Sequence, residues 1–295
     1  MSSKTLKLNC HSVKSLLKNT LSKTTQNMMT YLSDFLQTKE PESLHQYRVN
    51  IRMARSVCLE LSDFMEEKRK NKLDKILKTL QQETNDMRDI DVFIECIGAY
   101  KNSVDPQCLS EFEGIEAKLK AEKEEAYKAF EAKYTEAFQT HIMTQLQSLQ
   151  NDDLLCLPKS EEKLFKYIKE IFFHRLKKIA KASKKLTLSA PNERFHKLRL
   201  HYKKLRYNAD AVKLNQFSKS FKPLQTAFGN VQDKNSQIER IKHYNVAHSV
   251  CLEQIIALLE QELILDKQAC IEKSSKENIV RMKNSLEKIF TCKDS

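Results

Sequence analysis

Two stretches of the sequence, about 150 residues apart, carry the same arrangement of cationic side chains. The first reads LHQYRVNIRMAR over residues 44–55, and the second reads FHKLRLHYKKLR over residues 195–206. In each, a histidine is followed by arginine or lysine three, seven and ten positions later. At about 100° per residue, this spacing places all four groups on one stripe of a helix. The two cationic stripes consist of His45, Arg48, Arg52 and Arg55, and of His196, Arg199, Lys203 and Arg206.

Rows of guanidinium and ammonium groups suit the binding of phosphate groups. Like charges three or four residues apart destabilise a helix slightly, and no acidic residue is interleaved on either stripe to relieve this repulsion. A face that only meets solvent typically mixes Glu with Lys. We therefore interpret the stripes as anion-binding surfaces and the two histidines as phosphate donors. A metal-binding role is disfavoured, because neither histidine has a Cys, His, Asp or Glu at ligand spacing on its own helix.

An apolar stripe runs beside each cationic one. It consists of Leu44, Tyr47, Ile51, Ala54, Cys58 and Leu61 in the first stretch, and of Phe195, Leu198, Tyr202, Leu205, Ala209 and Val212 in the second. Each helix should therefore bury one face and carry its cations along the edge of that face. The aromatic residues are interpreted as core residues, and the chain has no Trp, so no platform for stacking nucleic-acid bases is expected. These residues favour a linear phosphate chain as the ligand, with a nucleic-acid backbone second.

A longer internal repeat surrounds these stretches. LQQETNDMRDIDVFIECI at 80–97 matches LQTAFGNVQDKNSQIERI at 224–241 with a constant offset of 144. At the same offset, Lys75 and Lys78 correspond to Lys219 and Lys222. We predict two copies of one helical unit, residues 1–150 and 151–295, that form two similar bundles related by a pseudo-two-fold axis.

The composition predicts an all-α protein. Of 295 residues 40% are hydrophobic, but only 3 are Gly and 5 are Pro, too few turn residues for a β-rich fold. The stretch 109–149 is expected to form one long, exposed, acidic helix, and 267–291 an additional C-terminal helix. The other helices are expected at about 11–38, 42–66, 68–85, 88–101, 160–186, 192–215, 218–230 and 233–264.

The charge is large and unevenly distributed. The formal net charge is +12, and the isoelectric point is near 9.2. Residues 159–222 hold 19 Lys and Arg against 5 Asp and Glu, whereas residues 105–138 hold 5 against 9. Such a concentrated surplus indicates a polyanionic partner, which could be nucleic acid, an anionic membrane or a phosphate polymer.

The cysteines give no sign of a metal site or a disulfide framework. The eight of them form no CxxC pair and no zinc-finger spacing with histidine. They are interpreted as single small hydrophobic residues of a protein in a reducing compartment. Neither a signal-peptide-like apolar run nor an apolar stretch of 18 residues occurs, so we expect a soluble cytoplasmic protein without a membrane partner.

Taken together, these motifs resemble those of the CHAD family, the histidine-centred α-helical domain. LHQYRVNIRMARSV with DMRDIDVF, and then FHKLRLHYKKLRYNAD with LQTAFGNVQD, follow the family order over residues 12–265. The resemblance implies two four-helix bundles facing each other across a basic cavity that binds inorganic polyphosphate, and an association with polyphosphate granules. It implies that the two cationic stripes line opposite walls of that cavity.

Further residues are carried over with this resemblance. The additional candidate polyphosphate-binding residues are Lys75, Lys78, Arg88, Lys204, Lys219 and Lys222. Asp89 and Asp233, which correspond in the two copies, are expected to orient arginines rather than to bind the ligand.

Other function classes remain open at this point. The chain has no Walker A loop and no ExExK signature, so we expect a protein without catalytic residues, cofactor or metal. A protein that binds the backbone of RNA or DNA would use the same charges. A scaffold that docks another protein along 109–149, or an accessory to a polyphosphate-processing enzyme, are further alternatives.

Overall fold

The computed structural model describes residues 8–9, 12–102, 105–147, 156–244 and 249–291. Within these ranges every regular element is a helix, so the all-α prediction is confirmed. The α-helices are α1 (Val13–Thr38), α2 (Pro41–Glu60), α3 (Glu67–Gln82), α4 (Asn85–Lys101), α5 (Leu109–Lys133), α6 (Glu136–Gln147), α7 (Glu161–Ser183), α8 (Asn192–Ala211), α9 (Asn215–Lys219), α10 (Lys222–Tyr244), α11 (Val250–Lys273) and α12 (Lys276–Ile289).

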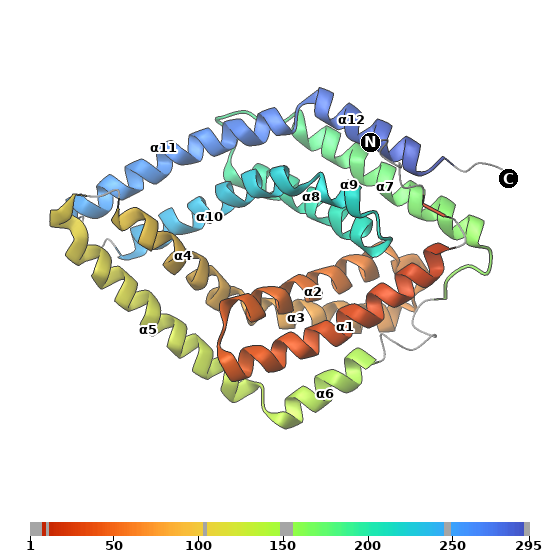
Figure 1. The fold of residues 1–295 in the computed structure, drawn as a ribbon, viewed down its shortest axis with the longest axis horizontal. Coiled ribbons are helices and arrows are strands. Elements are labelled where there is room, and N and C mark those ends of the chain that lie inside the picture. The colour runs from red at the N-terminus through yellow and green to blue at the C-terminus, as the bar shows by residue number, and fades with distance from the viewer. Residues whose placement is uncertain (1–7, 10–11, 103–104, 148–155, 245–248, 292–295) are drawn as a thin grey trace, which may run out of the picture.

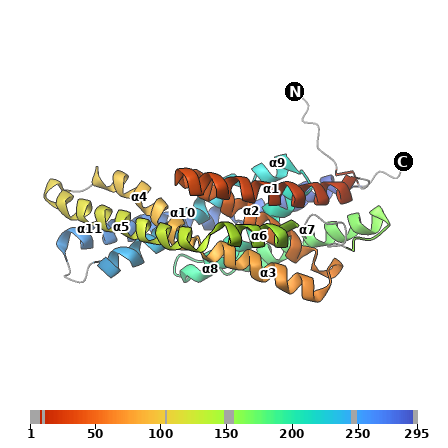
Figure 2. The ribbon, with the colours of Figure 1, turned by 90° about the horizontal axis from the view of Figure 1, so that it is seen from below.

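The helices form a flattened, ring-like arrangement. Helix α1 packs along α2, α4 along α5, α7 along α8 and α10 along α11. Figure 1 shows α2 and α8 in the middle, α4 and α10 running from there toward the left, and α5 and α11 along the outer edges. Figure 2, turned by 90°, shows how thin the molecule is in the third direction.

The apolar stripes form the core of the two central helices. Leu44, Tyr47, Ile51 and Ala54 on α2, and Phe195, Leu198, Tyr202 and Leu205 on α8, are each no more than 1% exposed. The prediction that these aromatic residues serve the core is therefore confirmed. Burial of these faces fixes the rotation of α2 and α8 about their axes, and with it the direction in which the cationic stripes point.

The long helix expected at 109–149 is in fact two helices, α5 and α6. The chain turns at Tyr134, which is 2% exposed and stacks on Phe130 with ring centroids 3.9 Å apart. The Tyr134 hydroxyl donates to Glu83 Oε2 at 2.8 Å, and the Gln139 side-chain amide donates to the Tyr134 carbonyl at 2.9 Å. Tertiary packing at the end of α3 thus interrupts a sequence of strong helix formers.

The break expected between 230 and 233 is absent, because α10 runs without interruption from Lys222 to Tyr244. Its apolar face continues across the expected break from Phe228 through Val231 to Ile238, all buried. Within this stretch, the Asn230 side-chain amide donates to Asp266 Oδ1 of α11 at 3.2 Å.

The interpretation of the cysteines as single hydrophobic residues is wrong for two of them. Cys108, at the end of the 3₁₀-helix η3 (Pro106–Cys108), forms a disulfide with Cys251 at the start of α11. No local spacing could reveal this pair, because 143 residues separate its members. Among the described residues, Cys58, Cys96, Cys156 and Cys270 are free.

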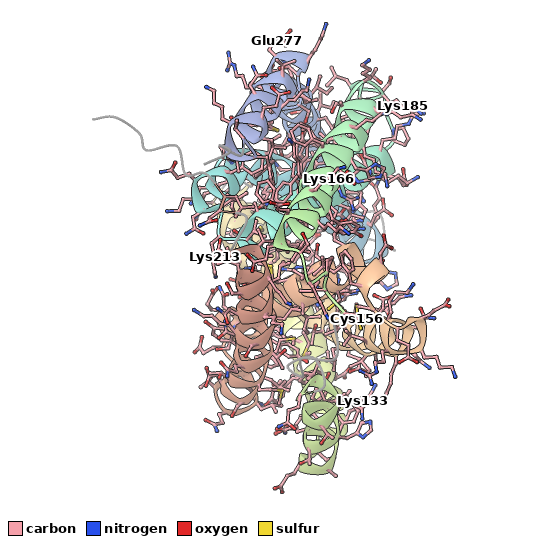
Figure 3. The ribbon with its side chains drawn as sticks, turned by 90° about the vertical axis from the view of Figure 1, so that its right-hand side faces the viewer. Lys133, Cys156, Lys166, Lys185, Lys213 and Glu277 are labelled. Carbon is pink, nitrogen blue, oxygen red and sulfur yellow. A yellow bond between two sulfur atoms is a disulfide. The ribbon has the colours of Figure 1, made fainter. Side chains whose placement is uncertain are left out.

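The end of the molecule opposite this disulfide is rich in exposed lysines. In Figure 3, which views that end, Lys166 lies on α7 and Lys185 just beyond it, with the free and exposed Cys156 below them. None of the described helices is long and apolar enough to span a membrane.

Candidate functional site

The two central helices meet at the cationic stripes. Helix α2 begins at Pro41, which is favourable at the first helical positions, and Glu42 follows in its first turn. Helix α8 begins directly after Pro191. The two helices contact each other, and Arg52 Nε donates a hydrogen bond to the Tyr207 hydroxyl at 3.0 Å.

A cavity of about 910 Å³ opens beside this contact, between α2 and α4 on one side and α8 and α10 on the other. Its wall contains six Arg and Lys side chains and four carboxylates from the described residues. The charged and titratable lining residues are His45, Arg48, Arg52, Arg88, Asp89, Glu122, Arg199, Lys203, Asp233, Glu239, Arg240 and His243. The cations come from both predicted repeats and face one space.

Arg48 is fixed in the wall by neutral acceptors. Its Nη1 donates to the Gln81 carbonyl at 2.9 Å and to Thr84 Oγ1 at 2.6 Å, and its Nη2 donates to Asn85 Oδ1 at 2.8 Å. These groups orient the guanidinium without cancelling its charge. Burial and then the charge of Arg52 lower the pKa of Arg48 to about 10.

Arg199 and Lys203 supply the facing cations from α8. Among the residues that the structure describes, neither forms an ion pair with a carboxylate. Burial lowers the pKa of both Arg199 and Lys203. The charge of Arg52 lowers both pKa values further, and the charge of Arg199 lowers that of Lys203. Asp233 opposes these effects only in part. The wall therefore carries positive charge that nothing in its vicinity neutralises fully.

The two histidines occupy different positions. His45 lies in the cavity wall, and its pKa is lowered first by burial and then by Arg88 and Arg52. His196 is half-buried and is not among the lining residues, but its Nδ1 lies 2.6 Å from Oε1 of Gln232, which is. His45 is therefore placed to meet a ligand directly, whereas His196 orients Gln232.

Asp89 and Asp233 face the cavity instead of pairing with arginines. Within the described part of the chain, no ion pair of 4.0 Å or less joins either carboxylate to an arginine. Asp89 nevertheless interacts electrostatically with Arg48, and Asp233 with Arg199, so the expectation that they orient arginines stays a prediction. Burial raises the pKa of both carboxyls, and Arg48 and Arg199 respectively counteract this effect. Each carboxylate adds a negative charge to the wall.

Some predicted site residues belong to other contacts. Arg55 forms an ion pair with Asp74 of α3, with Nε 2.7 Å from Oδ1. Arg206 contacts Asp210, with Nε 3.4 Å from Oδ2, and donates to Gln225 of α10. Both arginines stand one turn beyond the cavity wall, where a neighbouring acceptor engages them.

The remaining predicted lysines lie farther away. Lys204 is half-buried on another face of α8, where burial and then Arg175 lower its pKa. Lys75 and Lys78 are exposed on α3. Lys219 and Lys222 line a separate groove of about 590 Å³ between α10 and α11. The structure thus brings six of the predicted residues together in the cavity: His45, Arg48, Arg52, Arg88, Arg199 and Lys203.

Sequence reasoning missed the residues at the far end of the cavity. Arg240 and His243 extend the line of lining residues on α10 that begins with Gln232 and Ser236, at helical spacing. That spacing was the available signal, but the repeat concealed it, because the residue 144 positions before Arg240 is Cys96. Glu122 of α5 joins them, accepting from Arg240 Nη1 at 2.9 Å and from the Tyr244 hydroxyl at 2.7 Å.

The wall of this cavity carries six cationic side chains against four carboxylates, a composition that suits an anion. The described residues contain no group of three or more His, Cys, Asp or Glu side chains placed to hold a metal ion together. Guanidinium and ammonium groups fixed at several points of one elongated space can engage several phosphate groups of one ligand at once.

Comparison with known proteins is consistent with this geometry. The family model of the CHAD domain matches residues 19–249. Among solved structures, the chain is similar to PptA from Streptomyces chartreusis, with a TM-score of 0.66 and 12% identity over 92% of this chain and 98% of that one. It is also similar to the CHAD domain from the plant Ricinus communis, with a TM-score of 0.62 and 16% identity over 96% and 92%. No curated protein matches the chain.

Proposed function

The chain belongs to the CHAD domain family, and we propose that it binds inorganic polyphosphate, without transforming it, in the cavity between α2–α4 and α8–α10. One observation supports this most directly. Cations from both predicted repeats line one cavity, and Arg48, Arg199 and Lys203 have no carboxylate partner there among the described residues.

The electrostatics of the cavity wall favour an anion. Burial and mutual repulsion lower the pKa of Arg48, Arg199 and Lys203, so the protonated forms are stabilised when a negative ligand enters. Because Arg48 is already oriented by neutral acceptors, it loses little conformational entropy on binding.

The lining favours a bare phosphate chain over nucleic acid. The lining aromatic residues are Phe93, which is 2% exposed, and Tyr244, whose hydroxyl is engaged by Glu122. Phe93 offers no ring face to a base, and Tyr244 is a single half-buried ring, not a platform on which successive bases could stack. A nucleic-acid backbone stays the alternative ligand, because it would use the same cations.

The proposal includes a cytoplasmic location on polyphosphate granules. A disulfide in that compartment is typically transient and redox-sensing rather than structural. The Cys108–Cys251 bond is therefore compatible with this location only as a reversible element.

Calorimetric titration with long-chain polyphosphate and with a length-matched single-stranded RNA, at two salt concentrations, tests the proposal. We expect polyphosphate to stay bound at a salt concentration at which RNA has dissociated. Equal affinities that fall in parallel would identify a general polyanion surface instead. Metal-dependent release of orthophosphate from the bound chain would contradict the non-catalytic part of the proposal.

A pair of matched double variants locates the site. Arg52→Gln with Lys203→Gln removes two charges from the cavity wall, and we expect it to lower polyphosphate affinity at least tenfold. The slope of the logarithm of affinity against the logarithm of salt concentration should decrease by about one unit per lost contact. Arg55→Gln with Arg206→Gln removes two charges from the same helices outside the cavity and should change affinity little. Equal effects of the two variants would place the binding site elsewhere.

A further inference from the structure

The two halves of the chain, residues 1–150 and 151–295, touch on both sides of the cavity. On one side α2 contacts α8, where Arg52 donates to Tyr207 at 3.0 Å. On the other side α4 contacts α10, where the Tyr100 hydroxyl donates to Gln237 Oε1 at 2.8 Å. Gln237 is itself a lining residue, so this second contact closes the cavity opposite the first.

A second layer of contacts reinforces this closed side. Glu122 of α5 accepts from Arg240 and from Tyr244 of α10, and all three residues line the cavity. Farther out, the Ser249 hydroxyl donates to Glu111 of α5. Beyond these lies the Cys108–Cys251 disulfide, at the corner where the first residues of α5 and α11 meet on the left of Figure 1. We call this set of contacts the α5–α11 joint.

The disulfide is the strongest part of the α5–α11 joint. The Glu122–Arg240 ion pair has side chains 42% and 26% exposed, and solvent-exposed pairs contribute little to stability. The Glu111 and Ser249 side chains are exposed as well. Without the covalent bond, a few solvent-accessible hydrogen bonds and the α4–α10 contact hold this side of the cavity.

We propose that the Cys108–Cys251 disulfide is a redox-controlled tie that closes the cavity around a bound polyphosphate chain, an inference that rests on the function proposed above. When both sides of the cavity are closed, a long linear polymer enters and leaves only by passing an end through it. When the tie is reduced, only the α4–α10 contact and the solvent-accessible hydrogen bonds of the α5–α11 joint close this side; these part without a covalent restraint, and the polymer enters sideways. Reduction therefore accelerates both loading and release.

The redox step is an ordinary thiol–disulfide exchange with a dithiol reductant. Cys251 is partly exposed, whereas Cys108 is 4% exposed, so a thiolate reaches the Cys251 sulfur first. The S–S bond breaks, and Cys108 leaves as a thiolate and takes up a proton. The second thiol of the reductant then displaces Cys251, which gives two cysteine thiols and a cyclic disulfide of the reductant. Oxidation by a two-electron oxidant such as a small-molecule disulfide reverses the step.

Polyphosphate chains that carry a bulky globular protein at both ends test this tie. The oxidised protein should bind uncapped chains and chains capped at one end, but it should bind doubly capped chains at least tenfold more slowly. Treatment with a dithiol, or the substitution Cys108→Ser or Cys251→Ser, should restore fast binding of doubly capped chains. Cys156→Ser, which removes a free and exposed cysteine, is the matched control and should behave as the unaltered protein.

The outcomes separate the tie from the function on which it rests. Fast binding of doubly capped chains by the oxidised protein overturns the tie while leaving polyphosphate binding intact. Absence of binding to uncapped chains in both redox states overturns the proposed function itself. Retained binding of uncapped chains by Cys108→Ser and Cys251→Ser, together with an unchanged helical circular-dichroism signal, shows that those variants are folded.

Discussion

The Arg52 guanidinium on α2 donates its Nε hydrogen to the Tyr207 hydroxyl on α8 at 3.0 Å. Tyr207 is 5% exposed, so the hydroxyl is a rigid acceptor. Through this bond, a residue of the second half of the chain orients a cation of the first half at the rim of the cavity. The interface between the halves and the candidate site thus share one hydrogen bond.

Tyr207→Phe should weaken polyphosphate binding without unfolding the protein. The substitution keeps the buried ring but removes the acceptor, so Arg52 loses its fixed orientation. A hydrogen bond of about 1 kcal/mol corresponds to roughly a fivefold loss of affinity, which calorimetric titration resolves. Tyr167→Phe is the control, because it removes a hydroxyl that donates to Asp63 at 2.9 Å on the outer surface. An unchanged affinity in Tyr207→Phe would mean that Arg52 needs no such support.

Polyphosphate affinity should increase as the pH falls from 8 toward 6. In the free protein, burial and then Arg88 and Arg52 hold the pKa of His45 below its ordinary value of 6.5. A bound polyanion raises this pKa, so binding is coupled to proton uptake at pH values between the free and the bound pKa. Burial also raises the pKa of Asp89 and Asp233. Protonation of these carboxyls at lower pH removes their repulsion of phosphate, so it increases the affinity further.

Titration in two buffers of different ionisation enthalpy measures this proton uptake. His45→Gln should abolish the part of it that occurs near neutral pH, whereas His174→Gln, on an exposed position of α7, should leave it intact. An affinity that rises with pH in the unaltered protein would contradict the assigned role of His45.

Most helices follow from local features of the sequence, and the exceptions depend on tertiary contacts. Alternation of apolar and charged residues, with few Gly and Pro, was sufficient to predict α1, α3, α4 and α7 to within about a turn. The break between α5 and α6 depends on the contact of Tyr134 with Glu83, about 50 residues earlier in the chain. Periodicity within a window of one helix contains no information on such a partner.

The same distinction applies to the candidate site. Helical spacing predicts which residues lie on one cationic stripe. Whether a given turn of that stripe faces the cavity or a neighbouring helix depends on the elements that pack against α2 and α8. Arg52 lines the cavity and donates to Tyr207, whereas Arg55 pairs with Asp74 of α3. The disulfide left no such signal, because 143 residues separate its members and the offset of 144 pairs Cys108 with Leu252 rather than with Cys251.

Glu60→Gln should destabilise the fold by about 3 kcal/mol. The Glu60 carboxylate, on α2, accepts from Arg175 Nη2 of α7, and the two side chains are only 16% and 9% exposed. Without it, the buried guanidinium faces mainly His201, whose Nδ1 lies 3.3 Å from Nη1. Burial and then Arg175 lower the pKa of His201 to about 4, so His201 is neutral at pH 7; an imidazole supplies no negative charge and cannot replace the carboxylate.

Urea-induced unfolding at pH 7 measures the loss of stability. The control is Glu287→Gln, which removes a carboxylate 3.4 Å from Lys283 within α12, where the side chains are 53% and 57% exposed. An exposed pair of this kind contributes at most about 0.5 kcal/mol, so the two substitutions should differ by roughly 2 kcal/mol or more. Equal unfolding midpoints would show that Arg175 finds another acceptor or reaches solvent. In that case, the contact between α2 and α7 would depend on its apolar residues alone, because burial of Leu61 and Phe172, both 1% exposed, does not require the ion pair.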